Sequence, residues 1–156
     1  MQQVRAFSKS DSGFTIIEIL VVLVIIGILA VLIASTRAGI QRNNRNQERQ
    51  RDIQDIYQQL EAYYVNDSVY PTLADMNNGG WIKTNLKTLD PESLRDPSSN
   101  SYHLAAKPQV GAYSYDVRSA NGSACDNLKN ICAHYTLTAT LEAGSIHTTY
   151  TKSSLN

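Results

Sequence analysis

Residues 14–34, FTIIEILVVLVIIGILAVLIA, form an apolar run in which Glu18 is the one charged residue. At about 1.5 Å per residue, a helix of this length covers about 30 Å, the apolar thickness of a bilayer. The run is apolar on every face, so its helix must be buried in lipid or among other helices. The remaining chain is too small to surround such a helix, which disfavours the core helix of a soluble protein.

A short polar leader precedes this run, carries Arg5 and Lys9, and ends at Gly13. The pattern G-F-T-x-x-E in front of an apolar run resembles the prepilin signature of type IV pilins and type II secretion pseudopilins. The resemblance implies that a membrane prepilin peptidase cuts between Gly13 and Phe14. It also implies that Phe14 becomes the N-methylated amino terminus of the mature protein.

Glu18 needs a physical explanation, because a carboxylate inside a membrane helix costs a few kcal/mol. A cut before Phe14 would create an α-amino group in the same apolar layer. Opposite charges about 4 Å apart gain about 4 kcal/mol at an effective dielectric near 20, which is comparable to that cost. We therefore expect Glu18 to pair with the Phe14 amine of a neighbouring subunit and to act in assembly. The alternative is a lone carboxylate that reaches the lipid headgroups.

The length of 156 residues suits one small domain with an anchor. The apolar residues Ile53, Ile56, Tyr57, Leu60, Tyr63 and Tyr64 recur at helical spacing and predict an amphipathic helix. We expect four segments: a cleaved leader at residues 1–13, a transmembrane or filament-core helix at 14–35, its amphipathic continuation at 36–65, and a globular head at 66–156. Many pilins have a proline where this chain has Ser35, so melting of the helix between Gly27 and Ser35 stays open.

Alternating apolar and polar residues predict three strands, at residues 112–118, 134–141 and 146–152. A two-residue turn between the last two strands would place Ile146 opposite Leu141. The preceding segment, residues 72–112, has many turn signals and is expected to be loop-rich, with one helical turn at 91–95. The expected fold class is α+β and type IV pilin-like: a long N-terminal helix packed on a small antiparallel sheet of about three strands.

Cys125 and Cys132 are the two cysteines of the chain. In an extracytoplasmic protein, two cysteines most simply form one disulfide. Their spacing does not match a C-x-x-C redox pair, and no second ligand pair accompanies them for zinc. Free thiols are the next alternative, and metal binding is disfavoured.

No catalytic constellation is present in the sequence, so we expect no enzyme activity and no cofactor. His103, His134 and His147 are scattered over loop and strand positions. The acidic residues near turns are Asp90, Asp96, Asp116 and Asp126. Some pseudopilins bind calcium, but without a ligand-spacing motif Asx turns and helix caps explain these residues, and no metal is expected.

A basic stretch follows the apolar run, with Arg37, Arg42, Arg45, Arg49 and Arg51 against Glu48 and Asp52. Three interpretations are open. The first is a solvated helix surface with local pairs such as Arg45–Glu48. The second is contact with outer headgroups, combined with ion pairs between subunits. The third is attraction of DNA phosphates, which is disfavoured because head domains would cover this part of a filament.

The resemblance implies a structural subunit of a type IV pilus-like surface filament, with adhesion and twitching motility as associated roles. A type II secretion pseudopilin or a competence pilin has the same signature. A more distant alternative is an uncleaved, signal-anchored extracellular binding module. The implied partners are other copies of the chain, other pilins, prepilin peptidase and an assembly platform in the inner membrane. The implied topology is a single pass through the cytoplasmic membrane, with the leader on the inner side and the C-terminus outside, before transfer to the surface pilus.

Overall fold

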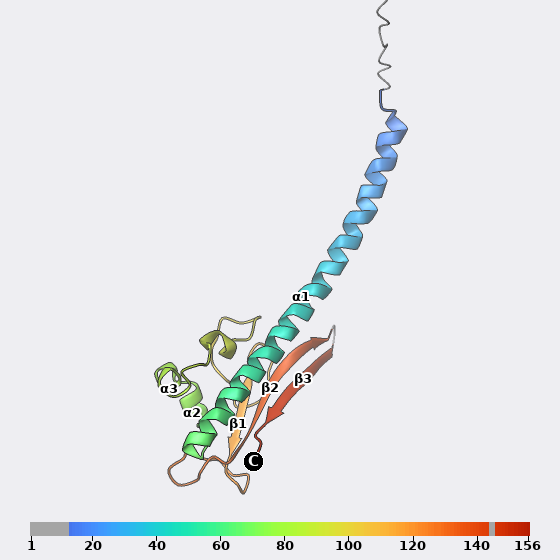
Figure 1. The fold of residues 1–156 in the computed structure, drawn as a ribbon. Coiled ribbons are helices and arrows are strands. Elements are labelled where there is room, and N and C mark those ends of the chain that lie inside the picture. The colour runs from blue at the N-terminus through green and yellow to red at the C-terminus, as the bar shows by residue number, and fades with distance from the viewer. Residues whose placement is uncertain (1–12, 144–145) are drawn as a thin grey trace, which may run out of the picture. The chain divides into compact units, whose positions relative to one another are not determined.

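The computed structural model describes residues 13–143 and 146–156 (Figure 1). The expected leader, apart from Gly13, lies outside the described residues. The chain divides into two units, Met1–Gly39 and Ile40–Asn156, and each is described by itself.

Helix α1 runs from Ile16 to Asp67 and contributes to both units. In the second unit it is amphipathic, and Ile53, Ile56 and Leu60 are fully buried. The helix ends where Ser68 adopts a positive φ of 58°. The helix was expected to end at residue 65, so its observed end at Asp67 lies two residues later.

Three short helices follow, where the sequence predicted loops with one helical turn. They are α2 (Leu73–Met76), α3 (Gly79–Asn85) and the 3-10 helix η1 (Pro91–Leu94). Asn78 caps α3, because its side chain accepts hydrogen bonds from the backbone N–H groups of Gly80 and Trp81. A helix therefore begins at Gly79, inside the segment that was expected to be loop-rich. The expected turn at 91–95 corresponds to η1.

The three strands are β1 (Ser114–Arg118), β2 (His134–Ala143) and β3 (Ile146–Ser153). They form an antiparallel sheet in the order β1-β2-β3. The hairpin register was predicted wrongly by two residues: Ile146 pairs with Ala143, and Leu141 pairs with Thr148. A shift of two residues keeps each side chain on its expected face.

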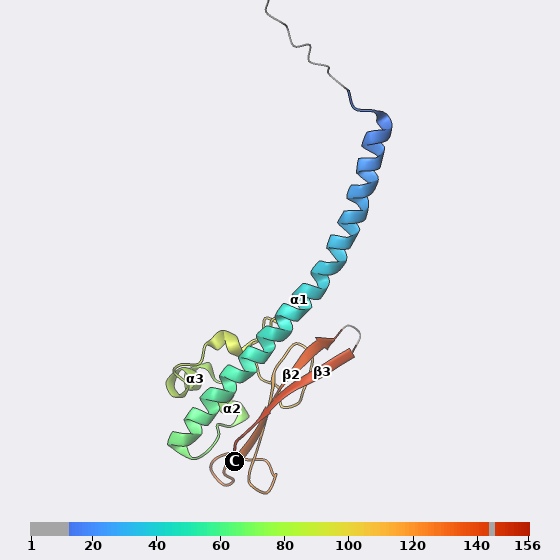
Figure 2. The ribbon, with the colours of Figure 1, turned by 45° about the vertical axis from the view of Figure 1, so that its right-hand side comes forward.

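The core of the second unit lies between α1 and one face of the sheet (Figures 1 and 2). Tyr135, Leu137 and Ala139 of β2 are buried there. The expected α+β fold, with a long N-terminal helix on a three-stranded antiparallel sheet, is confirmed. The reason is that α1 and β2 each bury a continuous apolar face that needs a partner.

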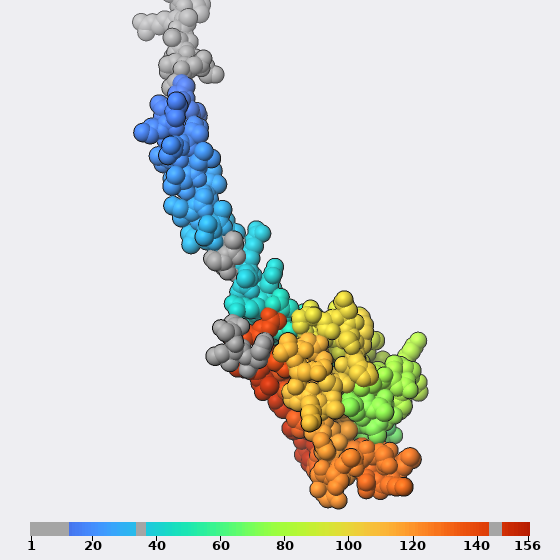
Figure 3. All heavy atoms as spheres, turned by 180° about the vertical axis from the view of Figure 1, so that it is seen from behind, coloured from blue at the N-terminus to red at the C-terminus, as the bar shows by residue number. Residues whose placement is uncertain are grey.

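The two margins of the sheet differ. Beside β1, Ala105 forms a parallel bridge with Ser114, so the loop before β1 covers that margin. Seen from behind, residues near 105 occupy the middle of the head, and the red strands lie along its border (Figure 3). No further strand pairs with the outer side of β3 among the described residues.

Candidate functional site

The apolar part of α1 is exposed along its whole described length. The large apolar side chains from Phe14 to Ile33 are between 45% and 89% exposed. By length and composition the helix could cross a membrane. An apolar surface of this extent in water is unfavourable, so lipid or other helices must cover it.

The start of α1 is closed by a reciprocal contact between Thr15 and Glu18. The Thr15 hydroxyl accepts from the Glu18 backbone N–H at 3.3 Å. The Glu18 carboxylate in turn accepts from the Thr15 backbone N–H at 3.4 Å. This is the capping-box arrangement, in which two otherwise free backbone donors gain partners. Sequence reasoning missed this role, although the pattern T-x-x-E before an apolar run is its signal.

The basic stretch of α1 is not a uniform solvated surface. Arg49 is 1% exposed and makes a bidentate ion pair with Asp96, which is also 1% exposed. The Arg49 Nε–Asp96 Oδ2 distance is 2.7 Å, and Arg49 Nη2 lies 3.0 Å from Asp96 Oδ1. The expectation that Asp96 merely forms a turn was therefore incomplete, because the same carboxylate neutralises a buried guanidinium.

Glu142 joins this cluster from the end of β2. It accepts from Arg49 at 2.8 Å and forms a second ion pair with Arg45. Asn46 completes the link, because its side chain donates to the backbone carbonyl of Glu142 and accepts from its N–H. The expected local pair Arg45–Glu48 is replaced by a contact across the fold. The cluster therefore fastens the loop after η1 and the end of β2 to α1.

The charges of the cluster stabilise one another. The hydrogen bond from Arg45 is the largest cause that lowers the pKa of Glu142, to about 2. Burial alone would raise the pKa of Asp96, but hydrogen bonds from Arg49 and Ser98 outweigh it and lower that pKa. Both carboxylates are thus held in the charged form.

Asp52 lies next to this cluster and behaves in the opposite way. Its carboxylate accepts a hydrogen bond from the Tyr113 hydroxyl. Burial is the largest cause that raises the pKa of Asp52, to about 6, and the nearby charges of Glu48, Asp55 and Asp96 add to the increase. The hydrogen bond from Tyr113 opposes it without cancelling it.

The structure contains the expected disulfide between Cys125 and Cys132. Asn127, with a φ of 56°, holds the enclosed loop against Tyr70, in the segment that follows α1. Its side chain donates to the Tyr70 carbonyl at 2.7 Å and accepts from the Cys132 N–H at 2.8 Å. Asp126 accepts three backbone N–H groups within the loop, which is the Asx-type role expected from the sequence.

Other candidate residues are not gathered into a site. His134 donates its Nδ1–H to the backbone carbonyl of Asn156, while Asp90 caps η1 and Asp116 pairs with Arg118. Among the described residues, no group of three or more His, Cys, Asp or Glu side chains could hold a metal ion.

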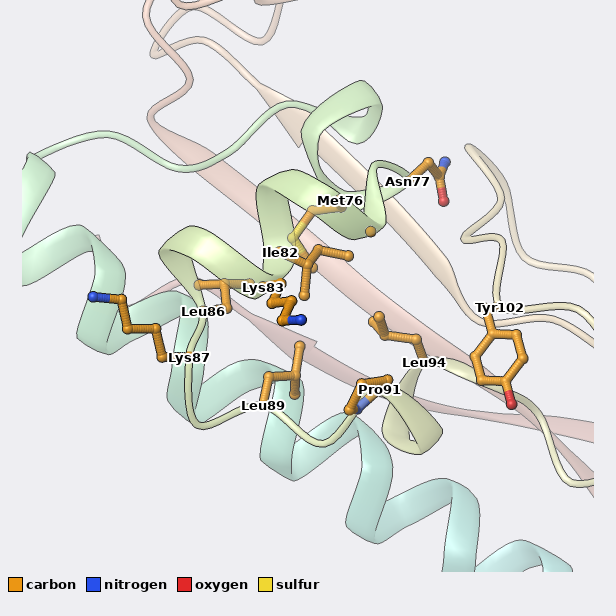
Figure 4. A pocket seen from close by; sticks show the side chains of 11 residues that line it. Met76, Asn77, Ile82, Lys83, Leu86, Lys87, Leu89, Pro91, Leu94 and Tyr102 are labelled. Carbon is orange, nitrogen blue, oxygen red and sulfur yellow. The ribbon is translucent and has the colours of Figure 1, made fainter.

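A hollow of about 640 Å³ lies between α2, α3 and η1 (Figure 4). Its apolar side chains, such as Met76 and Leu94, gather in the view, whereas Lys87 points away from them. The methionine, isoleucine and leucine side chains of the lining are at most 6% exposed, so they belong to the packed core. The lining holds no carboxylate, histidine or cysteine.

Residues 8–34 match the model of the prokaryotic N-terminal methylation motif. This motif is the cleavage and methylation signal of type IV pilins and pseudopilins. The chain therefore carries the signal of a type IV pilin-like or pseudopilin precursor, which is a structural class of protein. The resemblance found in the sequence is confirmed for this segment.

No curated protein and no solved structure matches the chain.

Proposed function

We propose that this protein is the structural subunit of a type IV pilus-like surface filament, polymerised through its N-terminal helix. The observation that carries this proposal is the methylation motif directly before an apolar helix whose side chains are 45–89% exposed. Packing among the helices of other subunits would keep these side chains out of water once the segment has left the membrane.

The proposed life cycle has two stages. Prepilin peptidase removes residues 1–13 and the new amino terminus, Phe14, is methylated. The segment 14–35 holds the subunit in the inner membrane, with the head at 66–156 outside, until the assembly platform inserts it into the filament. The continuation at 36–65 then supports the head.

A secretion pseudopilin or a competence pilin remains the second candidate function, since the motif is common to these classes. The ion pairs of Arg45 and Arg49 are evidence about a role in DNA uptake. Arg45 and Arg49 are engaged by Glu142 and Asp96, so they do not form part of a free row of cations. This leaves fewer arginines for phosphate binding and disfavours the competence role.

Processing is the first test. The precursor is produced with and without its native prepilin peptidase, and the mature mass and N-terminal residue are determined by mass spectrometry. We expect a chain that begins with methylated Phe14. Gly13→Leu should abolish the cut, because the peptidase must approach the backbone closely there. Gly27→Leu, the same change inside the helix, should leave the cut unaffected.

A mature protein that still begins at Met1 beside an active peptidase would exclude the filament subunit and favour the uncleaved signal-anchored module. Electron microscopy of surface filaments, with identification of their most abundant subunit, then separates a pilus subunit from a secretion pseudopilin.

A further inference from the structure

The outer margin of β3 presents free backbone hydrogen-bonding groups. Ser154 donates its N–H to the carbonyl of Tyr135 at 3.1 Å, which fixes the residues of β3 that face β2. In an antiparallel pair these residues alternate along the strand. The backbone groups of Thr148, Tyr150 and Lys152 therefore point toward β2. Those of Thr149, Thr151 and Ser153 point outward.

This margin lacks the usual protection of an edge strand. Natural edges are shielded by proline, bulges or outward charges. β3 has no proline, and its register with β2 is unbroken from Ile146 to Ser153. Its one lysine, Lys152, is turned onto the ring of Tyr57 at 5.4 Å. The residues whose backbone groups point outward, Thr149, Thr151 and Ser153, are exposed.

A polar hollow of about 330 Å³ lies beside this margin, between β3 and α1. Its lining includes Tyr150 from β3, the amides of Gln50 and Gln54, and the two oppositely charged side chains of Arg51 and Asp55. Arg51 is exposed and makes no ion pair among the described residues. Its guanidinium is available to a carboxylate from outside.

We propose that the β3 margin is a docking site for an extended segment of another protein, which adds to the sheet as a fourth strand and places a carboxylate beside Arg51. Strand addition of this kind obtains affinity from main-chain hydrogen bonds and specificity from alternate side chains. A second copy of β3 fits less well. Strand β3 carries no acidic residue, and its Lys152 would bring a like charge toward Arg51.

The test uses the full-length protein in detergent micelles and the acetylated, amidated peptide TVTETVT. In this peptide the valines and the glutamate share the face turned to the hollow, and the threonines share the other face. We expect saturating peptide to slow hydrogen exchange of the Thr149, Thr151 and Ser153 amides about tenfold, as measured by NMR. Arg51→Gln should weaken binding by about fivefold.

Backbone dependence is tested with a matched pair of variants. Thr151→Pro removes one outward N–H and should abolish protection, whereas Thr151→Val keeps that N–H and should bind like the wild type. As a second measurement that does not depend on folding of the proline variant, the peptide is N-methylated at its third and fifth residues, whose N–H groups would face β3. That peptide should not bind the wild-type protein.

The proposal is overturned if TVTETVT leaves the three amides unprotected, or if the methylated peptide binds equally well. Self-association that is lost in Thr151→Pro without any peptide would assign the margin to a second copy and would also overturn it. None of these readouts depends on cleavage or filament formation, so the proposed function is tested separately.

Discussion

Asp52 gives the protein a pH-dependent stability. Its pKa in the folded state, about 6, lies above the ordinary value of 3.8. The folded state therefore binds the proton more tightly, and the stability that Asp52 contributes is present below pH 3.8 and lost as the pH rises through 6. Asp52→Asn keeps an acceptor for the Tyr113 hydroxyl and removes the buried charge. We expect it to raise the free energy of unfolding by about 1 kcal/mol at pH 8 and to change it little at pH 4.

Chemical unfolding of the full-length protein in detergent at both pH values measures this difference. Asp67→Asn, at an exposed position at the end of α1, is the control and should show no such pH-dependent gain, because Asp67 does not contribute to the raised pKa of Asp52. The contribution of Glu142 to stability depends on pH in the opposite direction, because its pKa is lowered from 4.5 to about 2. Its contribution is present above pH 4.5 and lost as the pH falls toward 2. An equal gain in stability for Asp52→Asn at pH 4 and pH 8 would refute the raised pKa of Asp52.

Arg49 should be among the most sensitive positions of the second unit. Arg49→Met would leave the buried Asp96 carboxylate without its counter-charge, and breaking a buried pair from one side costs about 3–5 kcal/mol. Arg51→Gln, at an exposed neighbouring position, should stay within about 0.5 kcal/mol of the wild type. The double variant Arg49→Met with Asp96→Leu should recover part of the loss. Urea unfolding of the three variants gives these values, and a mild Arg49→Met would contradict the buried cluster.

These pairings could not be predicted from the sequence. Arg49 lies 47 residues from Asp96 and 93 from Glu142, and no local pattern connects such distant charges. The sequence offered Arg45 a nearer partner in Glu48. Tertiary packing instead brings Glu142 within reach, because β2 ends beside α1. By contrast, the Thr15–Glu18 contact is local and could have been found from its spacing alone.

The loop enclosed by the Cys125–Cys132 disulfide is hydrogen-bonded to Tyr70, in the segment that follows α1. Closing so small a ring is expected to stabilise the folded state by about 2–3 kcal/mol in the chain-entropy model. The double variant Cys125→Ser with Cys132→Ser should lower stability by this amount. Reduction of the wild type should produce the same loss in thermal unfolding, while the double variant should not respond to the reductant. A wild type indifferent to reduction would show that the Asn127 contacts suffice.

The regular elements were predicted to different extents for physical reasons. The strands and α1 have long periodic patterns, which identify the element and its buried face. Helices α2 and α3 are too short for such a pattern, and the Gly79-Gly80 pair that begins α3 reads as a loop. The hairpin register depends on which two residues form the turn. With 144 and 145 between the paired Ala143 and Ile146, every pair moves by two positions.

The whole chain combines a head with its own core and a helix that has none. The general fold could be predicted because each part is encoded locally: residues 14–34 are apolar apart from Thr15 and Glu18, and α1 from Ile53 onward is amphipathic. What covers the apolar part is not encoded in one copy of the chain. The methylation motif is the observation that points to other subunits.

Glu18 has two possible roles, one in the capping box of α1 and one as the partner of a neighbouring Phe14 amine. One pair of variants separates them. Thr15→Val removes the hydroxyl that caps α1 and should cost about 1 kcal/mol of helix stability, with filaments still formed. Glu18→Ala keeps this hydroxyl cap, but it removes the carboxylate half of the capping box and also the proposed partner of the neighbouring Phe14 amine. We expect it to be cleaved and inserted but to form few or no filaments, with Glu18→Gln intermediate at best. Filament yield by electron microscopy, normalised to mature protein, is the measurement. Equal yields from Thr15→Val and Glu18→Ala would reduce Glu18 to a helix cap and remove the pairing between subunits.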